Sequence, residues 1–127
     1  MSKKIIFSDN APAAIGPYSH AVEANGTLYV SGQVPFNPET MEVVEGGIVE
    51  QTKQSLANID AILKDSGYTK FDVVKATIFI KDMNEFPVIN EAYGEYFEGH
   101  KPARECVEVA RLPRDVRVEI SVIATKE

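Results

Sequence analysis

The residue types best suited to chemistry lie close to the C-terminus, in two stretches whose apolar and polar residues alternate as in β-strands. Arg104 and Cys106 share one face of residues 103–110, and Glu119 lies on the polar face of residues 117–124. If the two strands pair as a hairpin, Cys106 lies opposite Glu119. Arg104 is then a diagonal neighbour of Glu119, at a backbone separation of about 7–8 Å. This register predicts that all three side chains project from the sheet face that carries no helix.

These three side chains could form a small pocket for a carboxylate. An arginine presents a planar fork that binds a carboxylate through two parallel hydrogen bonds, a geometry that lysine cannot supply. A glutamate in a partly dry site can orient a water molecule or transfer a proton. The Cys106 thiol would be a weak hydrogen-bond donor, or a nucleophile if its pKa fell from about 8.5. The alternative interpretation is an ordinary cross-strand ion pair beside a half-buried cysteine, which contributes little free energy.

The charge of the chain limits the classes of partner. All four arginines lie near the C-terminus, and Arg111, Arg114 and Arg117 are interpreted as solvated charges around a turn. The chain as a whole is acidic, with 13 Lys and Arg against 19 Asp and Glu and a formal net charge of -6. Phosphate neutralisation supplies most of the affinity in nonspecific nucleic-acid binding, and stacking aromatics are absent from the arginine stretch. The sequence therefore disfavours nucleic acid as a partner.

Cysteine and histidine counts bear on cofactors and compartment. Two histidines and one cysteine, far apart in the sequence, match no zinc spacing, and no nucleotide-binding glycine motif is present. We therefore expect no metal and no organic cofactor. The single cysteine excludes an internal disulfide and is typical of a reducing compartment, and no apolar stretch is long enough to cross a bilayer. A cytoplasmic location without a membrane partner is expected.

The elements that must position the pocket follow from periodicity and turn signals. The chain of 127 residues is predicted to form one domain, residues 1–127. Asn25-Gly26 is a strong hairpin signal. The predicted strands cover residues 19–24, 28–34, 72–80, 103–110 and 117–124, and the predicted helices cover residues 48–64 and about 81–99. This ββαβαββ order indicates an α+β domain with both helices on one face of a sheet.

The opposite sheet face presents a difficulty. It is expected to carry polar and ionisable residues together with the aromatic side chains of Tyr29 and Phe79. Such a face must be hydrated or covered by another subunit.

Three segments together resemble one protein family. They are Ala14-Ile-Gly-Pro-Tyr-Ser19, Tyr29-Val-Ser-Gly-Gln33, and Pro102-Ala-Arg-Glu-Cys-Val107 continuing to Arg111-Leu-Pro-Arg114 and Val118-Glu-Ile120. By these segments the chain resembles the RidA/YjgF family of enamine/imine deaminases. The similarity runs in order from about Ile5 to Ala124, and its C-terminal segment is the most specific part.

The resemblance implies a fold and an activity. It implies a chorismate-mutase-like fold assembled as a homotrimer, in which three sheets form an internal barrel and the pockets lie between subunits. A mixed sheet face would then line the barrel. The implied activity is a cofactor-independent hydrolysis of 2-iminobutanoate and 2-iminopropanoate to 2-keto acids and ammonia. The enamine 2-aminoacrylate, which tautomerises to 2-iminopropanoate, would be hydrolysed in the same way.

The resemblance also implies roles for six residues. Arg104 would bind the substrate carboxylate, and Glu119 would position the attacking water. Cys106 is counted with these two as catalytic, since its backbone and thiol would contact the substrate in the pocket. The other residues would bind the substrate by lining or covering the pocket: Tyr18, Ser31 and Asn90. Without the resemblance, the last three would be interpreted as a tyrosine packed in a turn, a small strand residue and an exposed helix residue.

The chain departs from the family pattern at two positions. Glu105 stands where serine is common, and Ser121 stands where an acidic residue is frequent. Strand parity places Glu105 with Val107, away from Arg104, but a carboxylate so near could compete for the guanidinium. Both departures bear on substrate preference and rate.

Two other functions are consistent with the resemblance. One is an endoribonuclease or translation inhibitor, an activity also attributed to members of the family. The other is a non-catalytic role as a metabolite-binding regulator or chaperone.

Overall fold

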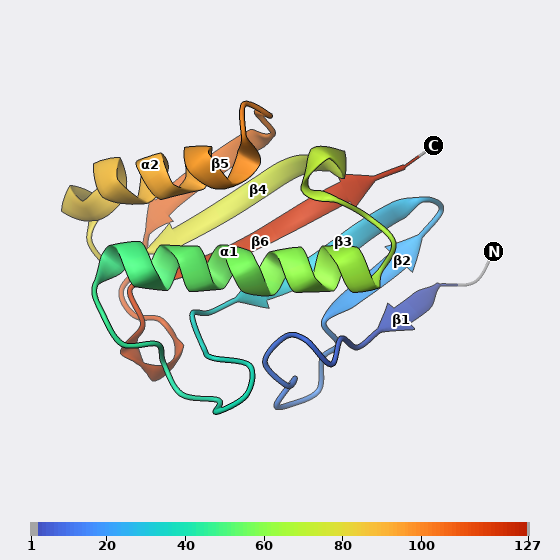
Figure 1. Ribbon diagram of the computed structural model, residues 1–127, viewed down its shortest axis with the longest axis horizontal. Helices are drawn as coiled ribbons and strands as arrows, with labels where there is room; N and C mark the ends of the chain where they lie inside the picture. Colours follow the sequence, from blue (N-terminus) through green and yellow to red (C-terminus); the bar gives the residue numbers. More distant parts are fainter. Residues whose placement is uncertain (1–2, 127) are drawn as a thin grey trace.

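The computed structural model describes residues 3–126 and contains a six-stranded sheet with two helices on one face (Figure 1). The predicted α+β class, with both helices on one side of the sheet, is confirmed. The strands are β1 (Lys4–Ile6), β2 (Ala21–Ala24), β3 (Thr27–Gln33), β4 (Val73–Ile80), β5 (Ala103–Glu108) and β6 (Val118–Thr125), and the helices are α1 (Ile48–Asp65) and α2 (Phe86–Phe97). Single turns of 3-10 helix lie at Lys70–Asp72, Met83–Glu85 and Pro113–Asp115.

The order of the strands differs from the prediction at both ends of the chain. The sheet runs β1-β2-β3-β6-β4-β5, and the short strand β1 was not predicted. β6 lies between β3 and β4 and is antiparallel to both. β5 lies at the sheet edge, parallel to β4, so the predicted hairpin of residues 103–110 with 117–124 is wrong. Alternation is a local signal, and it does not determine which strand becomes a neighbour.

The first hairpin forms where its turn residues predicted it. Asn25 and Gly26 have φ angles of 52° and 77°, the left-handed pair that a two-residue turn between twisted strands requires. A Cβ atom at Gly26 would lie 2.8 Å from the carbonyl oxygen of Lys126, so the position also needs glycine for space. The turn thereby fixes the register of β2 against β3, with Val22 opposite Tyr29.

Helix α1 matches the range expected from its periodicity. It begins after Gly47. The N–H group of Gly47 donates to the Glu50 carboxylate at 2.8 Å, so this backbone donor has a partner at the start of the helix. It ends before Ser66 and Gly67, and Gly67 has a φ of 83°. Helix α2 carries Pro87 in its first turn, where the missing N–H costs nothing.

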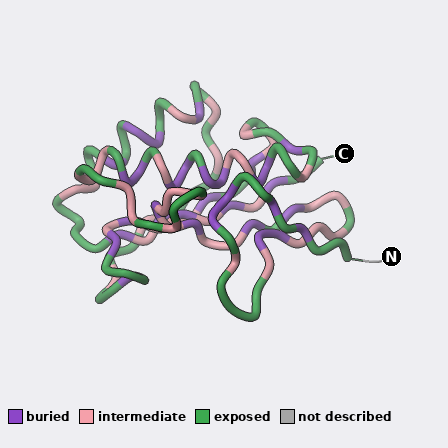
Figure 2. The backbone as a smooth tube through the Cα atoms, turned by 60° about the horizontal axis from the view of Figure 1, so that its bottom comes forward, coloured by how far each residue is buried: buried purple, intermediate pink, exposed green. Residues whose placement is uncertain are grey.

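The hydrophobic core lies between the sheet and the two helices. Buried residues (purple in Figure 2) alternate in β6 with less buried ones, and the inward residues of this strand are Val118, Ile120, Val122 and Ala124. The sheet face without helices, here called the open face, carries apolar residues as well. They are Ile5, Tyr29, Phe79, Val107 and Ile123, of which Ile5, Tyr29 and Val107 are strongly exposed.

The end of α2 gives a test of the core. Phe97 is 1% exposed, and its ring centroid lies 4.8 Å from the centroids of both Tyr93 and Tyr96. We expect Phe97→Ala to lower the free energy of unfolding by about 3–5 kcal/mol, because the cavity cannot collapse between rigid rings. Urea denaturation followed by circular dichroism measures this loss. The control Val88→Ala, on the exposed side of the same helix, should change stability by less than about 0.5 kcal/mol, and an equal loss in both variants would contradict the packing argument.

Candidate active site

Arg104 lies on β5 and faces α2. β4, α2 and β5 form a crossover unit with parallel strands, so α2 lies beside the helix-side face of β5 (Figure 1). An Arg104 Nη1–H donates to Oδ1 of Asn90 at 2.6 Å. The guanidinium carbon lies 5.3 Å from the ring centroid of Phe86 and 4.9 Å from that of Tyr93. We call Arg104, Asn90, Phe86, Tyr93 and Cys106 the arginine half-site.

The arginine half-site holds its guanidinium in place from one side. Asn90 takes one of the five N–H donors, and the two rings contact the planar group through cation–π attraction. Tyr93 is 6% exposed, and its hydroxyl has no hydrogen-bond partner among residues 3–126. Burial raises the pKa of Tyr93, and the Arg104 charge offsets part of that rise, so the phenol stays protonated. The remaining guanidinium donors are available to a bound carboxylate.

Cys106 is placed as a neutral thiol. It pairs in register with the buried Ile78 and packs against the core. Burial raises the pKa of the Cys106 thiol, and the nearby Arg104 charge lowers it by less. The histidines are engaged elsewhere: the ring of His20 bonds to Ser8 N–H and Pro12 C=O, and the ring of His100 bonds to Val73 C=O. A Cys–His nucleophile pair is therefore not formed in this structure.

Glu119 lies on β6 and projects from the open face. It pairs across the sheet with Phe79 on β4 and lies against Gly32 on β3, where the register of β3 shifts. A cavity of about 420 Å³ contains it, lined also by Tyr18 and Arg114 and by apolar residues that include Phe36. We call Glu119, Tyr18, Gly32, Arg114 and Phe36 the carboxylate half-site.

Burial makes ionisation of Glu119 less favourable than it is in water. Burial raises the pKa of Glu119, and no ion pair or hydrogen bond from another described residue opposes that effect. The Arg114 guanidinium contacts the Phe36 ring, with its carbon 5.5 Å from the ring centroid, rather than pairing with Glu119. A carboxylate whose pKa lies above its ordinary value is a stronger base, and is therefore better suited to accept a proton from water.

Ser31 and Tyr18 are connected through the loop before β2. The Ser31 hydroxyl donates to the Ser19 carbonyl at 2.6 Å, and the Ser31 N–H donates to the His20 carbonyl at 2.9 Å. These two bonds hold the chain next to Tyr18, whose side chain is 49% exposed. Ser31 therefore positions the loop that carries Tyr18 into the cavity.

The structure separates the three residues that the predicted hairpin brought together. Arg104 and Cys106 lie on the helix side of the sheet, at its edge, whereas Glu119 lies on the open face. The prediction that all three share the face without helices is wrong. β5 pairs with β4 instead of β6, and its register with the inward residues Ala76 and Ile78 points Arg104 and Cys106 toward α2.

The residues that depart from the family pattern lie on the open face. Parity predicted that Glu105 points away from Arg104, and Glu105 forms an ion pair with Lys75. It does not compete for the Arg104 guanidinium. Ser121 lies opposite Thr77 on the same face.

The other three arginines differ from one another. Arg111 forms an ion pair with Asp115 at 2.7 Å, and Arg117 pairs with Glu85, both at least partly exposed. Arg114, by contrast, has a left-handed φ of 56° and lines the Glu119 cavity. Sequence reasoning missed Arg114 because no motif marks a left-handed turn at arginine. It missed Gly32 because the sequence does not show which side chain lies against a strand glycine.

A comparison with known families decides where the chain belongs. The model of the family described as Endoribonuclease L-PSP matches residues 8–126. The chain belongs to this family. It is the family to which the RidA/YjgF proteins belong, so the resemblance of the three segments is confirmed.

Relatives match over nearly their full length. A RutC family protein from Pyrococcus horikoshii is 54% identical over 98% of this chain and 99% of its own. The mouse protein named 2-iminobutanoate/2-iminopropanoate deaminase is 49% identical over 98% of this chain and 92% of its own. A crystal structure of a Rid family protein from Yersinia pestis has a TM-score of 0.95 and 51% identity, covering 98% of this chain and 100% of that one. The six-stranded sheet with two helices is thus the fold of the family.

Two further observations bear on cofactors and membranes. Within residues 3–126, no group of three or more His, Cys, Asp or Glu side chains is arranged to hold a metal ion. Neither helix in the described part of the chain is both long and apolar enough to cross a bilayer.

Proposed function

We propose that the protein is a 2-iminobutanoate/2-iminopropanoate deaminase that hydrolyses reactive enamine and imine acids to 2-keto acids and ammonia. The mouse relative with that name, 49% identical over 98% of the chain, is the observation that carries the proposal. The two half-sites support it, because they supply the groups that this hydrolysis needs: a carboxylate-binding guanidinium and a titratable carboxyl group.

Each group has one role in the proposed reaction. Arg104 binds the substrate carboxylate with the donors that Asn90 leaves free. The enamine tautomerises to the imine, and Glu119 accepts a proton from water while the water oxygen bonds to the imine carbon. The imine nitrogen gains protons, the C–N bond of the carbinolamine breaks, and ammonia leaves with formation of the keto C=O bond.

The two half-sites must come from different copies of the chain. Within one copy they lie on opposite faces of the sheet, so one small substrate cannot contact both Arg104 and Glu119. We propose a homotrimer, in which the arginine half-site of one copy faces the carboxylate half-site of the next. The exposed apolar side chains of the open face support this assembly, since contact between copies would remove them from water.

A direct assay tests the activity. A serine dehydratase generates 2-aminoacrylate, and the release of pyruvate is followed with and without the protein. We expect release faster than the spontaneous hydrolysis and proportional to protein concentration. Release at the spontaneous rate would refute the deaminase.

Mixed assemblies test the shared site. Arg104→Ala and Glu119→Gln chains, each expected to be nearly inactive alone, are co-expressed, so that some interfaces join two unmodified half-sites. If the sites lie between copies, random mixing should restore about a quarter of the wild-type activity. No recovery in mixtures whose mass shows that they are trimers would place each site within one copy.

Cys106 has no covalent role in this mechanism. Because burial raises the pKa of the thiol, the nucleophilic thiolate is disfavoured near neutral pH. We expect Cys106→Ser to retain kcat within about fivefold of the wild type, a loss of no more than roughly 1 kcal/mol. A fall of a thousandfold, or a covalent adduct seen by mass spectrometry of the reacting enzyme, would show that the thiol is a nucleophile.

Gly32 keeps space for the Glu119 carboxyl group. A Cβ atom at position 32 would lie 3.0 Å from Cδ of Glu119 and closer still to one carboxylate oxygen. We expect Gly32→Ala to displace that carboxyl group and to lower kcat about 100-fold, since misplacement of a catalytic group by about 1 Å has such an effect. The melting temperature should change little, because the displaced atoms end a flexible side chain.

The matched control for Gly32→Ala is Gly47→Ala, at a position that lines neither half-site. A Cβ atom at Gly47, before α1, would make only ordinary contacts, the nearest 3.8 Å from Nη1 of Arg117. Its kcat should equal that of the wild type. Equal kcat values for all three proteins would contradict the proposed place of Glu119.

A second candidate function comes from the name of the family. The matching model is described as an endoribonuclease. The net charge of -6 opposes it, since RNA binding depends on neutralising phosphates. RNA cleavage that survives repurification and disappears in Arg104→Ala would favour that function over deamination. Tight binding of small carboxylates without turnover would instead favour a metabolite-binding regulator.

A further inference from the structure

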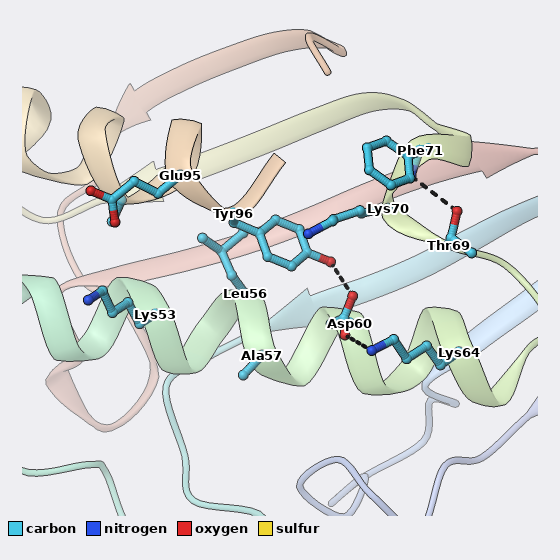
Figure 3. Close-up of a pocket in the computed structure, with 11 residues that line it drawn as sticks. Lys53, Leu56, Ala57, Asp60, Lys64, Thr69, Lys70, Phe71, Glu95 and Tyr96 are labelled. Atoms are coloured by element: carbon cyan, nitrogen blue, oxygen red, sulfur yellow. Dashed lines mark hydrogen bonds and ion pairs between the residues drawn. The ribbon is translucent and has the colours of Figure 1, made fainter. Parts of the chain in front are cut away.

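A cavity lies away from both half-sites, in the groove between α1 and α2 (Figure 3). Its volume is about 650 Å³, within the range of about 300–1,000 Å³ typical of small-molecule pockets. The floor is apolar: Leu56 is 2% exposed and Ala92 is 6% exposed, and the exposed methyl group of Ala57 lies beside them. We call this cavity the interhelical groove. It shares no lining residue with the two half-sites.

At one end of the interhelical groove, the charged side chains around Tyr96 are paired with one another or with neighbouring residues. The Tyr96 hydroxyl donates to Asp60 at 2.7 Å, and Asp60 also pairs with Lys64 at 2.9 Å. Lys70 lies over the Tyr96 ring, 5.0 Å from its centroid, and pairs with Glu98. These partners hold the Tyr96 ring across the groove, so this end offers an apolar surface and little unpaired charge.

Phe71 extends this apolar surface. Its side chain is 56% exposed at the edge of the groove. Burying such an exposed aromatic ring would provide roughly 25 cal/mol for each Å² of apolar surface removed from water. A ligand lying in the groove would cover part of it.

The other end of the groove carries one cation and one anion, each unpaired. Lys53 on α1 and Glu95 on α2 lie at this end, one from each helix (Figure 3). Neither side chain forms an ion pair or a hydrogen bond with any residue of the described chain. Lys53 lowers the pKa of the nearby Glu50 only slightly, because backbone hydrogen bonds from Gly47 and from Glu50 itself cause most of that lowering. A ligand that contacts both groups would carry a carboxylate for Lys53 and an ammonium group for Glu95, next to an apolar body.

We propose that the interhelical groove binds a free α-amino acid with a large apolar side chain. Lys53 binds its carboxylate and Glu95 binds its ammonium group, while the side chain lies on Leu56 and Ala92 toward Tyr96. A simple aliphatic carboxylate would place its negative charge beside Glu95, and a simple amine would place its positive charge beside Lys53. Only the zwitterion matches both.

A single introduced tryptophan reports binding at this place. The chain contains no tryptophan, so the emission of Phe71→Trp comes from the groove alone. Titration with L-leucine should give a saturable change in emission, at concentrations of roughly a millimolar for so open a site. Two matched ligands, 4-methylpentanoate and 3-methylbutylamine, each lack one charged group and should bind more weakly.

Substitutions of Lys53 and Glu95 distinguish leucine binding in the groove from binding at other sites. In the Phe71→Trp background, Lys53→Gln and Glu95→Gln should each weaken leucine binding about threefold to fivefold, as expected for partly exposed ion pairs. Lys64→Gln, which removes a paired lysine of the same groove, and Arg104→Ala, which removes the carboxylate site of β5, should leave the affinity unchanged. If Phe71→Trp does not fold, calorimetry of leucine binding to the wild type and to Ala57→Leu, whose larger side chain fills the groove, gives the same comparison.

Three results would overturn the proposal. The first is the absence of saturable binding at about ten times the expected dissociation constant. The second is an affinity that survives both Lys53→Gln and Glu95→Gln, or that disappears in Arg104→Ala. The third is equal binding of leucine and 4-methylpentanoate, which would show that Glu95 does not contact the ligand. None of these results bears on the deaminase assay, since the two sites share no residue.

Discussion

Arg104→Lys is expected to lower kcat/KM for imine hydrolysis about 10- to 100-fold, because one charge-assisted hydrogen bond to the substrate carboxylate is lost, worth about 1.5–3 kcal/mol. Lysine keeps the positive charge but lacks the planar fork that donates two parallel hydrogen bonds to a carboxylate while a further N–H donates to Asn90. The loss should appear mainly in KM if the carboxylate is bound equally in the ground and transition states. Steady-state kinetics with dehydratase-generated 2-aminoacrylate measure both constants.

The matched control for Arg104 is another exposed arginine of the same region. Arg111 is paired with Asp115 and lines neither half-site. Arg111→Lys should therefore have wild-type kcat and KM. An Arg104→Lys variant as fast as the wild type would refute the carboxylate-binding role of Arg104.

Glu119→Gln is expected to lower kcat about 10²- to 10⁴-fold while KM changes little, because glutamine can neither accept nor release the proton that water must lose. In the wild type, burial raises the pKa of Glu119, so the carboxylate that acts as base disappears as the pH falls through that raised value. The pH–rate profile should show this acidic limb, and the residual activity of Glu119→Gln should lack it. The control Glu105→Gln removes an open-face carboxylate paired with Lys75 and should retain the limb.

The same pKa shift predicts the effect of Glu119 on stability. The folded chain holds the Glu119 proton to a higher pH than the unfolded chain, whose value is near 4.5. The contribution of Glu119 to stability therefore decreases as the pH rises from about 4.5 through the raised folded pKa. Glu119→Gln should be at least as stable as the wild type at neutral pH. Thermal denaturation measures this, and a large destabilisation would mean that lost activity reflects lost structure.

Local signals predicted most of the elements. The Asn25-Gly26 turn and the periodicity of α1 depend on neighbouring residues, and the structure places both where the sequence predicted them. Within β5, parity correctly put Glu105 opposite to Arg104. The resemblance, in turn, correctly predicted the family and the α+β fold with helices on one face.

Non-local pairing could not be predicted in the same way. Residues 103–108 and 118–125 are close in sequence and alternate alike, yet β6 enters the sheet between β3 and β4. The sheet face on which Arg104 lies depends on the strand that pairs with β5, and that strand is β4 rather than β6. The sequence pattern therefore named Arg104 and Glu119 as site residues without showing that they lie on opposite sides of the sheet.

The central position of β6 has a consequence for biosynthesis. Among the described strands, the one made last, β6, is the one that joins β3 to β4, so the two halves of the sheet cannot be connected before residues 118–125 have been made. Until then, β3 and β4 each present an unpaired edge to other nascent chains. We therefore expect the emergence of β6, rather than that of α1 or α2, to be the event that commits each chain to its fold.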